Sequence, residues 1–137
     1  LYEEYMKSGL VKKDQSNLST LASTWNQAKD PKKAAAYYGQ AAAMGSDPDM
    51  YYKQGTALAM SEQYKDALVA LQKSLDAGAD NPGRIHMIMM EASFYSGDFK
   101  TAYVHVQEAK KDSSTARSAR SWEPYIKEKA KNRGVNL

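Results

Sequence analysis

The chain has 137 residues, within the size range of one domain, and its 42% hydrophobic and 26% charged content is ordinary for a globular protein. It has no cysteine, so disulfides, cysteine nucleophiles and thiolate metal sites are excluded. No apolar run approaches the roughly 20 residues that cross a membrane, and no secretory signal is visible. The chain begins at Leu1 in "LYEEYMKSG", which is typical of a helix already under way. We therefore expect the C-terminal part of a longer protein.

Regular turn signals divide the sequence into segments. Asp30-Pro31 and Asp47-Pro48 each place a capping side chain before a proline at the first helical position, and Asn81-Pro82 starts another helix. Asp98 is a further candidate N-cap, and Gly45 is expected to adopt the left-handed conformation that ends a helix. The expected helices are 31–45, 48–61, 64–78, 82–95, 98–111 and 116–132.

Apolar residues recur at helical steps of three and four in every segment. In "YKDALVALQKSL", for example, Tyr64, Ala67, Leu71 and Leu75 fall on one face. No segment shows the strict alternation of a half-buried strand. The sequence therefore predicts an all-α chain of short antiparallel helix hairpins.

The hairpins repeat with a period near 34 residues. At offsets of 33 and 35, the coinciding sets are Ala22, Gly55 and Met90; Ala34, Ala67 and Ala102; Tyr38, Leu71 and Val106; and Ala41, Ser74 and Ala109. Small residues let two helix backbones approach closely, and large residues from neighbours fill the remaining space. A two-helix period of this length is typical of a helical solenoid, in which stacked units bury one another's faces.

These residues resemble the tetratricopeptide repeat (TPR), which has small residues at its eighth and twenty-seventh positions and alanine at its twentieth. Residues 48–81 are the best match, and the other units are 15–47 and 83–115. In the third unit, Met90 stands where a small residue is usual and Ser93 where a large one is. Tyr37 is expected to point toward the next unit. The resemblance covers about residues 15–115 and implies a right-handed superhelical TPR solenoid.

The remaining C-terminal segment, about residues 116–133, matches no repeat unit. TPR arrays often end in a capping helix, and we assign this segment that role, so that residues 1–137 form a single TPR domain. Its inner face is expected to consist of Ala119, Trp122 and Ile126.

The resemblance also implies a concave groove, lined by the first helix of each unit, that holds a peptide of a partner protein. Methionine and aromatic side chains suit adaptable contacts of this kind, although at helical spacing they also suit a core. Of the basic and asparagine positions with which chaperone-tail binders hold a carboxylate, only Arg84 matches, so that ligand is not expected. Carried over by position, the groove residues are Ser19, Ser23, Asn26, Tyr52, Thr56, Met60, Arg84, Met87, Glu91 and Phe94.

The sequence offers no pattern for catalysis. His86 and His105 are expected about one turn apart on antiparallel helices, but no Asp, Glu or Ser accompanies them in the pattern of a triad or metal site. There is no HExxH, P-loop or GxGxxG motif. We expect a non-catalytic protein without cofactor or metal, in which the histidines are packed residues of the repeat.

Positive charge is concentrated at the C-terminal end, where the sequence from Lys110 onward has eight basic residues and three acidic ones. Such a surface is compatible with docking on anionic lipid or nucleic acid. The modest net charge of +3 and the lack of an RNA-binding signature favour a solvated face, so no nucleic-acid partner is expected. A regulatory or scaffold segment of a larger enzyme is another alternative, and end-to-end self-association is compatible with an exposed solenoid end.

A narrower resemblance involves both ends of the chain. "LVKKDQSNLSTLAS" near the start, and "ARSARSWEPYIKEKAKNRG" after "FYSGDFKTAYVHVQEAKK", are similar to TPR proteins that accompany TonB–ExbB–ExbD energy-transduction systems of Gram-negative bacteria. This resemblance implies a periplasmic location and a partner in that transport apparatus, with the cytoplasm as the alternative location.

Overall fold

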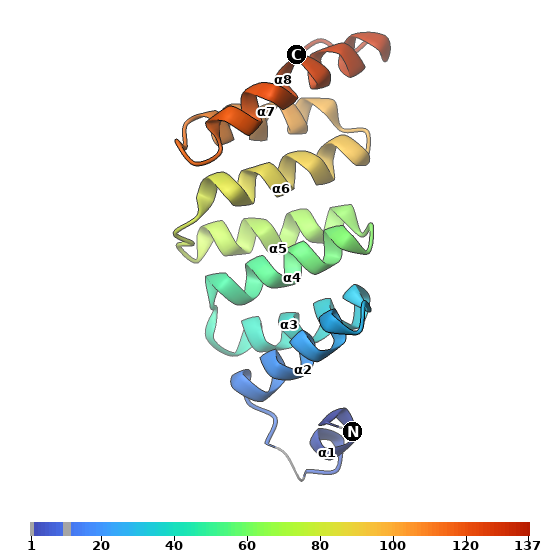
Figure 1. Ribbon diagram of the computed structural model, residues 1–137, viewed down its shortest axis with the longest axis vertical. Coiled ribbons are helices and arrows are strands. Elements are labelled where there is room, and N and C mark those ends of the chain that lie inside the picture. Colours follow the sequence, from blue (N-terminus) through green and yellow to red (C-terminus); the bar gives the residue numbers. More distant parts are fainter. Residues whose placement is uncertain (1, 10–11) are drawn as a thin grey trace. The chain divides into compact units, whose positions relative to one another are not determined.

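The computed structural model describes residues 2–9 and 12–137, and in these residues it contains eight α-helices and no strand (Figure 1). The prediction of an all-α fold is confirmed. The helices are α1 (Tyr2–Lys7), α2 (Gln15–Gln27), α3 (Pro31–Gly45), α4 (Pro48–Met60), α5 (Tyr64–Asp76), α6 (Pro82–Tyr95), α7 (Phe99–Lys110) and α8 (Ala116–Asn132).

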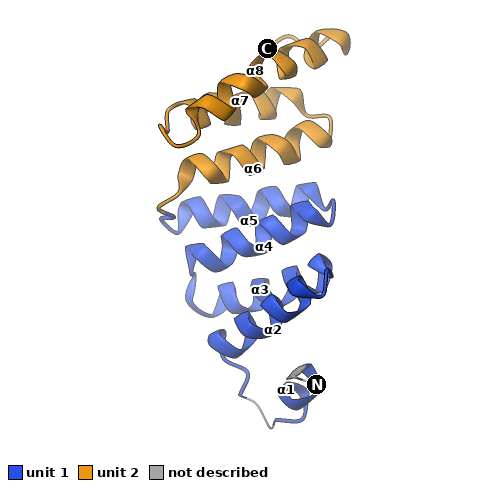
Figure 2. Ribbon diagram, viewed as in Figure 1, with its two compact units in different colours: residues 1–79 blue, residues 80–137 orange. Residues whose placement is uncertain are grey.

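The chain divides into two compact units, residues 1–79 and residues 80–137 (Figure 2). In the first unit α2 packs on α3, α3 on α4, and α4 on α5. In the second unit α6 packs on α7, and α7 on α8. The assignment of residues 1–137 to a single domain stays a prediction.

Helix starts follow the capping signals of the sequence. The carboxylates of Asp30, Asp47 and Asp98 each accept a hydrogen bond from a backbone N–H of the first turn that follows. At the end of α3 the prediction is wrong by one residue. Ser46, with φ 49° and ψ 43°, takes the left-handed conformation, and Gly45 is the last helical residue. A serine accepts this conformation at a modest cost that glycine avoids.

The small positions of the repeat form tight helix crossings in both units. Ala34 and Ala67 of the first unit and Ala102 of the second are all 0% exposed. Beside them lie the larger side chains Leu71 and Val106, which are also fully buried. The alternation of small and large residues therefore organises the core within each unit, as the sequence predicts.

Tyr37 does not point toward the next unit as predicted, but toward helix α1. Its hydroxyl donates a hydrogen bond to the Glu3 carboxylate of α1, and burial together with that carboxylate raises the pKa of Tyr37 to about 12. The indole Nε1 of Trp25 donates to the same carboxylate over 3.1 Å, and Lys7 pairs with it at 3.2 Å. Glu3 thus anchors the short helix α1 on the α2–α3 pair.

Helix α8 covers the second unit with the inner face expected from the sequence. Ala119 and Ile126 are 0% exposed, and Trp122 packs against the same core cluster as Met90 and Val106. Its other face is exposed and carries Lys127, Lys129, Lys131 and Arg133.

Candidate peptide-binding surfaces

Four of the predicted groove residues line one hollow in the first unit. Asn26 comes from the last turn of α2, and Tyr52, Thr56 and Met60 come from α4, where steps of four place them on one face. The hollow has a volume of about 170 Å³. An apolar cavity of about 150 Å³ holds a benzene molecule, so the space suits one large apolar side chain.

The hollow has an apolar floor and an adaptable rim. Tyr38 and Ala57, only 7% and 4% exposed, lie at its base. Met60 is 63% exposed, although it is an apolar side chain, and it is free to pack on a ligand. Asn26 is exposed and offers both amide donors and a carbonyl acceptor. This arrangement can bind an apolar side chain and hydrogen-bond the backbone beside it.

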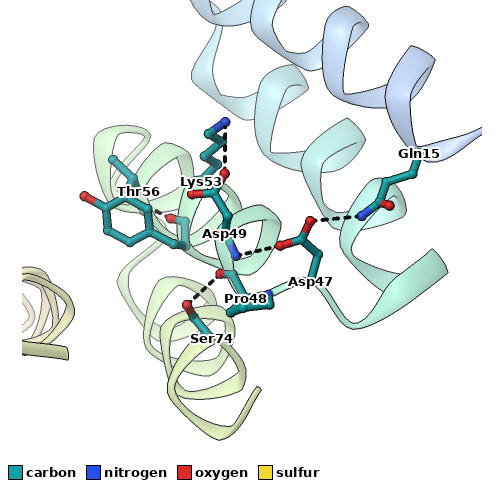
Figure 3. Close-up of polar contacts among 8 residues, drawn as sticks. Gln15, Asp47, Pro48, Asp49, Lys53, Thr56 and Ser74 are labelled. Atoms are coloured by element: carbon teal, nitrogen blue, oxygen red, sulfur yellow. Dashed lines mark hydrogen bonds and ion pairs between the residues drawn. The ribbon is translucent and has the colours of Figure 1, made fainter. Parts of the chain in front are cut away.

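Polar contacts at the start of α4 hold this helix in place (Figure 3). The Asp47 carboxylate caps α4 and accepts a hydrogen bond from Gln15 Nε2 of α2 over 3.3 Å. The hydroxyl of buried Ser74 on α5 donates to the Pro48 carbonyl over 2.7 Å. The start of α4 is therefore tied to helices on both sides of it.

Lys53 also lines the hollow, and its ammonium group pairs with Asp49 at 3.2 Å (Figure 3). The Thr56 hydroxyl donates to the Tyr52 carbonyl over 2.9 Å, which fixes its rotamer and leaves its lone pairs available. Ser19 and Ser23, two turns and one turn before Asn26 on α2, are half-buried and do not line the hollow.

The other four groove residues lie on α6 of the second unit. Arg84, Met87, Glu91 and Phe94 follow one another at steps of three and four, which places them on one side of the helix. Arg84 is exposed and the other three are half-buried. Met87 and Phe94 pack against the core cluster of this unit. Both side chains therefore belong partly to the core, one of the two roles that the sequence allows.

Phe94 is the centre of an aromatic cluster. Its ring centroid lies 5.6 Å from those of Phe99 and Trp122 and 5.3 Å from that of Tyr125. Tyr95 completes the cluster with an edge-to-face contact at 5.4 Å. Tyr95 and Tyr125 are 59% and 46% exposed, so the cluster forms part of the surface as well as part of the core.

Three solved structures resemble the chain over almost its whole length. YrrB, described as a TPR protein with an unusual peptide-binding site, is 22% identical with a TM-score of 0.70, and the match covers 97% of this chain and 66% of that chain. The fold is that of TPR proteins. A T3SS complex from Aeromonas hydrophila gives 12% identity and a TM-score of 0.71, covering 96% of this chain and 91% of that chain. MamA gives 14% identity and a TM-score of 0.65, covering 97% and 86%.

No protein-family model matches the sequence, and no curated protein sequence matches it. The likeness to TPR proteins is therefore one of fold and of repeat register. The chain spans 66% of the YrrB chain that it resembles.

Sequence reasoning missed several residues of these surfaces. Lys53 and Ala57 line the hollow but are not in the predicted set, although both are neighbours of predicted residues on α4. Tyr125 joins the aromatic cluster from α8, to which no groove role was given because that helix matches no repeat unit. A helical-wheel count extended to α8 places Tyr125 beside Trp122 and indicates its proximity to that residue.

The two histidines lie together, as predicted. The Nδ1 atoms of His86 on α6 and His105 on α7 are 3.0 Å apart, so one must donate a proton to the other. Burial lowers the pKa of both rings, and it lowers that of His105 to about 4. The described residues contain no group of three or more His, Cys, Asp and Glu side chains placed to hold a metal.

The basic end of the second unit forms a separate hollow of about 480 Å³. Tyr103 of α7 lines it with Lys127 and Lys131 of α8 and the residues 134–137.

None of the helices in the described part of the chain has the length and apolar character of a membrane span.

Proposed function

We propose that this chain is a non-catalytic protein-interaction module that binds a peptide segment of a partner through the first helices of its repeats. The hollow of the first unit carries the proposal. Residues selected from the sequence as groove-lining come from two helices and surround a space that fits one apolar side chain. YrrB, which has the same fold, is described as having an unusual peptide-binding site, and this supports peptide binding as the function.

Selection of random linear peptides displayed on phage against the immobilised chain tests this function. We expect enrichment of peptides with a conserved large apolar residue, which fluorescence polarisation of synthetic copies then measures. Met60→Ala and Tyr52→Ala should weaken their binding. Met44→Ala is the matched control, because Met44 is 51% exposed on α3 and does not line the hollow. Equal binding by the Met60 and Met44 variants contradicts the proposed site.

We further propose that the partner belongs to a TonB–ExbB–ExbD system and that the protein is periplasmic. The support is the similarity of residues 10–23 and 94–134 to TPR proteins of those systems. Biolayer interferometry against purified TonB and ExbD tests the partner, and fractionation of cells that produce the full-length protein tests the location. A cytoplasmic signal, or no binding to either protein, refutes this part and leaves the peptide-binding proposal standing.

A further inference from the structure

Glu91 is the unusual carboxylate of the second unit. It is half-buried on α6, with Met87 one turn before it and Phe94 one turn after it. Among the described residues, no hydrogen bond or ion pair reaches its carboxylate group. Glu123, by contrast, accepts a hydrogen bond from Gln107 and pairs with Lys110 at 3.1 Å.

The direction of the pKa shift separates Glu91 from three other carboxylates of the second unit. Hydrogen bonds and cations lower the pKa of Glu108, Asp112 and Glu123. Burial raises the pKa of Glu91, and no charged group acts on it. A partly desolvated carboxylate without a partner costs stability, and a cation supplied from outside would remove that cost.

The surface beside Glu91 also suits a cation. Phe94 follows Glu91 at three residues, a spacing that makes the two side chains neighbours on the helix. The face of Phe94 continues into Trp122 and Tyr125, with ring centroids 5.6 Å and 5.3 Å away. Aromatic faces attract ammonium and guanidinium groups, and here Lys129 already lies 5.7 Å from the Tyr125 centroid.

We propose that this face of the second unit receives a lysine or arginine side chain of the partner peptide, with its charge at Glu91 and its aliphatic stem against Phe94 and Trp122. This inference rests on the proposed function and names the chemistry of its partner. Exposed Arg84, two turns before Glu91 on the same side of α6, disfavours a second basic residue at that end.

The peptides selected on the immobilised chain provide the test. Synthetic copies are measured by fluorescence polarisation with the parent chain, with Glu91→Gln, and with Glu4→Gln as a control for the same charge change at an exposed residue of α1. A second set of peptides has each lysine or arginine replaced by norleucine. This set needs no protein variant, so it decides the question even if Glu91→Gln were poorly folded.

We expect the selected peptides to share a basic residue and to bind Glu91→Gln about tenfold more weakly than the parent or Glu4→Gln. Norleucine at that residue should cause a similar loss with the parent and little further loss with Glu91→Gln. Peptides that bind the parent and Glu91→Gln equally overturn this inference, while their loss with Met60→Ala keeps the proposed function. Failure to enrich any peptide overturns both.

Discussion

Gly55 on α4 lies so close to Leu71 on α5 that a Cβ atom at Gly55 would stand 2.6 Å from Leu71 Cγ and 2.7 Å from its Cδ2. Both residues are buried, and Leu71 is 0% exposed. The crossing of these two helices therefore requires a residue without a side chain at this position. It is the eighth position of the best-matching repeat, where the pattern calls for a small residue.

We expect Gly55→Ala to destabilise the protein by about 1–3 kcal/mol, because the added methyl group overpacks the α4–α5 crossing. Thermal and urea unfolding measure the change. Gly39→Ala is the matched control in α3. Its Cβ would meet only the flexible end of Gln54, at 2.8 Å from Nε2, so the higher helix propensity of alanine should give a gain of about 0.5–1 kcal/mol. Equal effects of the two substitutions would refute the tight crossing.

The third repeat, residues 83–115, departs from the size pattern of the other repeats at two positions, and at one of them a smaller neighbour makes room. In this repeat Met90 occupies the position of Gly55, and it is accommodated beside Val106, which is smaller than Leu71, the residue at the matching position of the second repeat. Ser93 stands where a large residue is usual and is 0% exposed. Its hydroxyl has no hydrogen-bond partner among the described residues.

Ser93→Ala should therefore stabilise the protein by about 1 kcal/mol, because it removes a buried hydroxyl that gains nothing from its surroundings. Ser74→Ala is the matched control and should act in the opposite direction by a similar amount, since the Ser74 hydroxyl donates to the Pro48 carbonyl over 2.7 Å. Both serines are 0% exposed, so burial alone cannot explain a difference. Differential scanning calorimetry of both variants distinguishes the two cases, and a loss of stability in Ser93→Ala contradicts the interpretation.

The repeat register was predictable because it depends on residue size at fixed spacing. Ala34, Ala67 and Ala102 occupy buried crossings as expected. The left-handed conformation of Ser46 after α3 was not predictable. Glycine usually takes this position, and nothing in the sequence indicates that the neighbouring serine takes it instead. The orientation of Tyr37 was also missed, because it depends on Glu3, a contact across 34 residues that local pattern does not reveal.

The candidate site likewise has one part that the sequence could indicate and one part that needs the structure. Asn26, Tyr52 and Met60 were selected from the sequence because groove positions recur with the repeat, and the structure places them around one hollow of the first unit. The isolation of Glu91 was not predictable. It depends on which charged groups fail to reach its carboxylate, and only three-dimensional distances decide that.

The histidine pair should make stability fall on acidification. His86 and His105 have folded-state pKa values below the unfolded value of 6.5, and His105 falls to about 4, so the folded protein binds fewer protons in this range. Their contribution is complete above about pH 6.5 and is lost as the pH falls toward 4. A second proton would place an N–H on each of two Nδ1 atoms only 3.0 Å apart.

Urea unfolding at pH 7.5 and pH 5 measures this effect in the parent and in a His86→Gln/His105→Gln double variant. The parent should lose about 1–2 kcal/mol more than the variant over this range, an amount that allows for the partial exposure of both rings. The nearby charged groups are Asp98, Glu108 and Lys111, and they are identical in the two proteins. Parallel pH profiles would show that the pair does not titrate as expected.

Glu91 predicts the opposite pH dependence, in the protein without a peptide. Burial raises its folded-state pKa above the ordinary value of 4.5, so the charged form destabilises the fold at neutral pH and the cost disappears as the group is protonated. We expect Glu91→Gln to be more stable than the parent by about 0.5–1 kcal/mol at pH 7.5, and the difference to vanish near pH 4. Urea unfolding at both pH values measures it, with Glu4→Gln as the exposed control. A neutral amide that lowers stability at pH 7.5 would mean that the carboxylate already has a compensating partner. In that case the unpaired charge of Glu91 could not explain both the higher stability of Glu91→Gln and its weaker peptide binding.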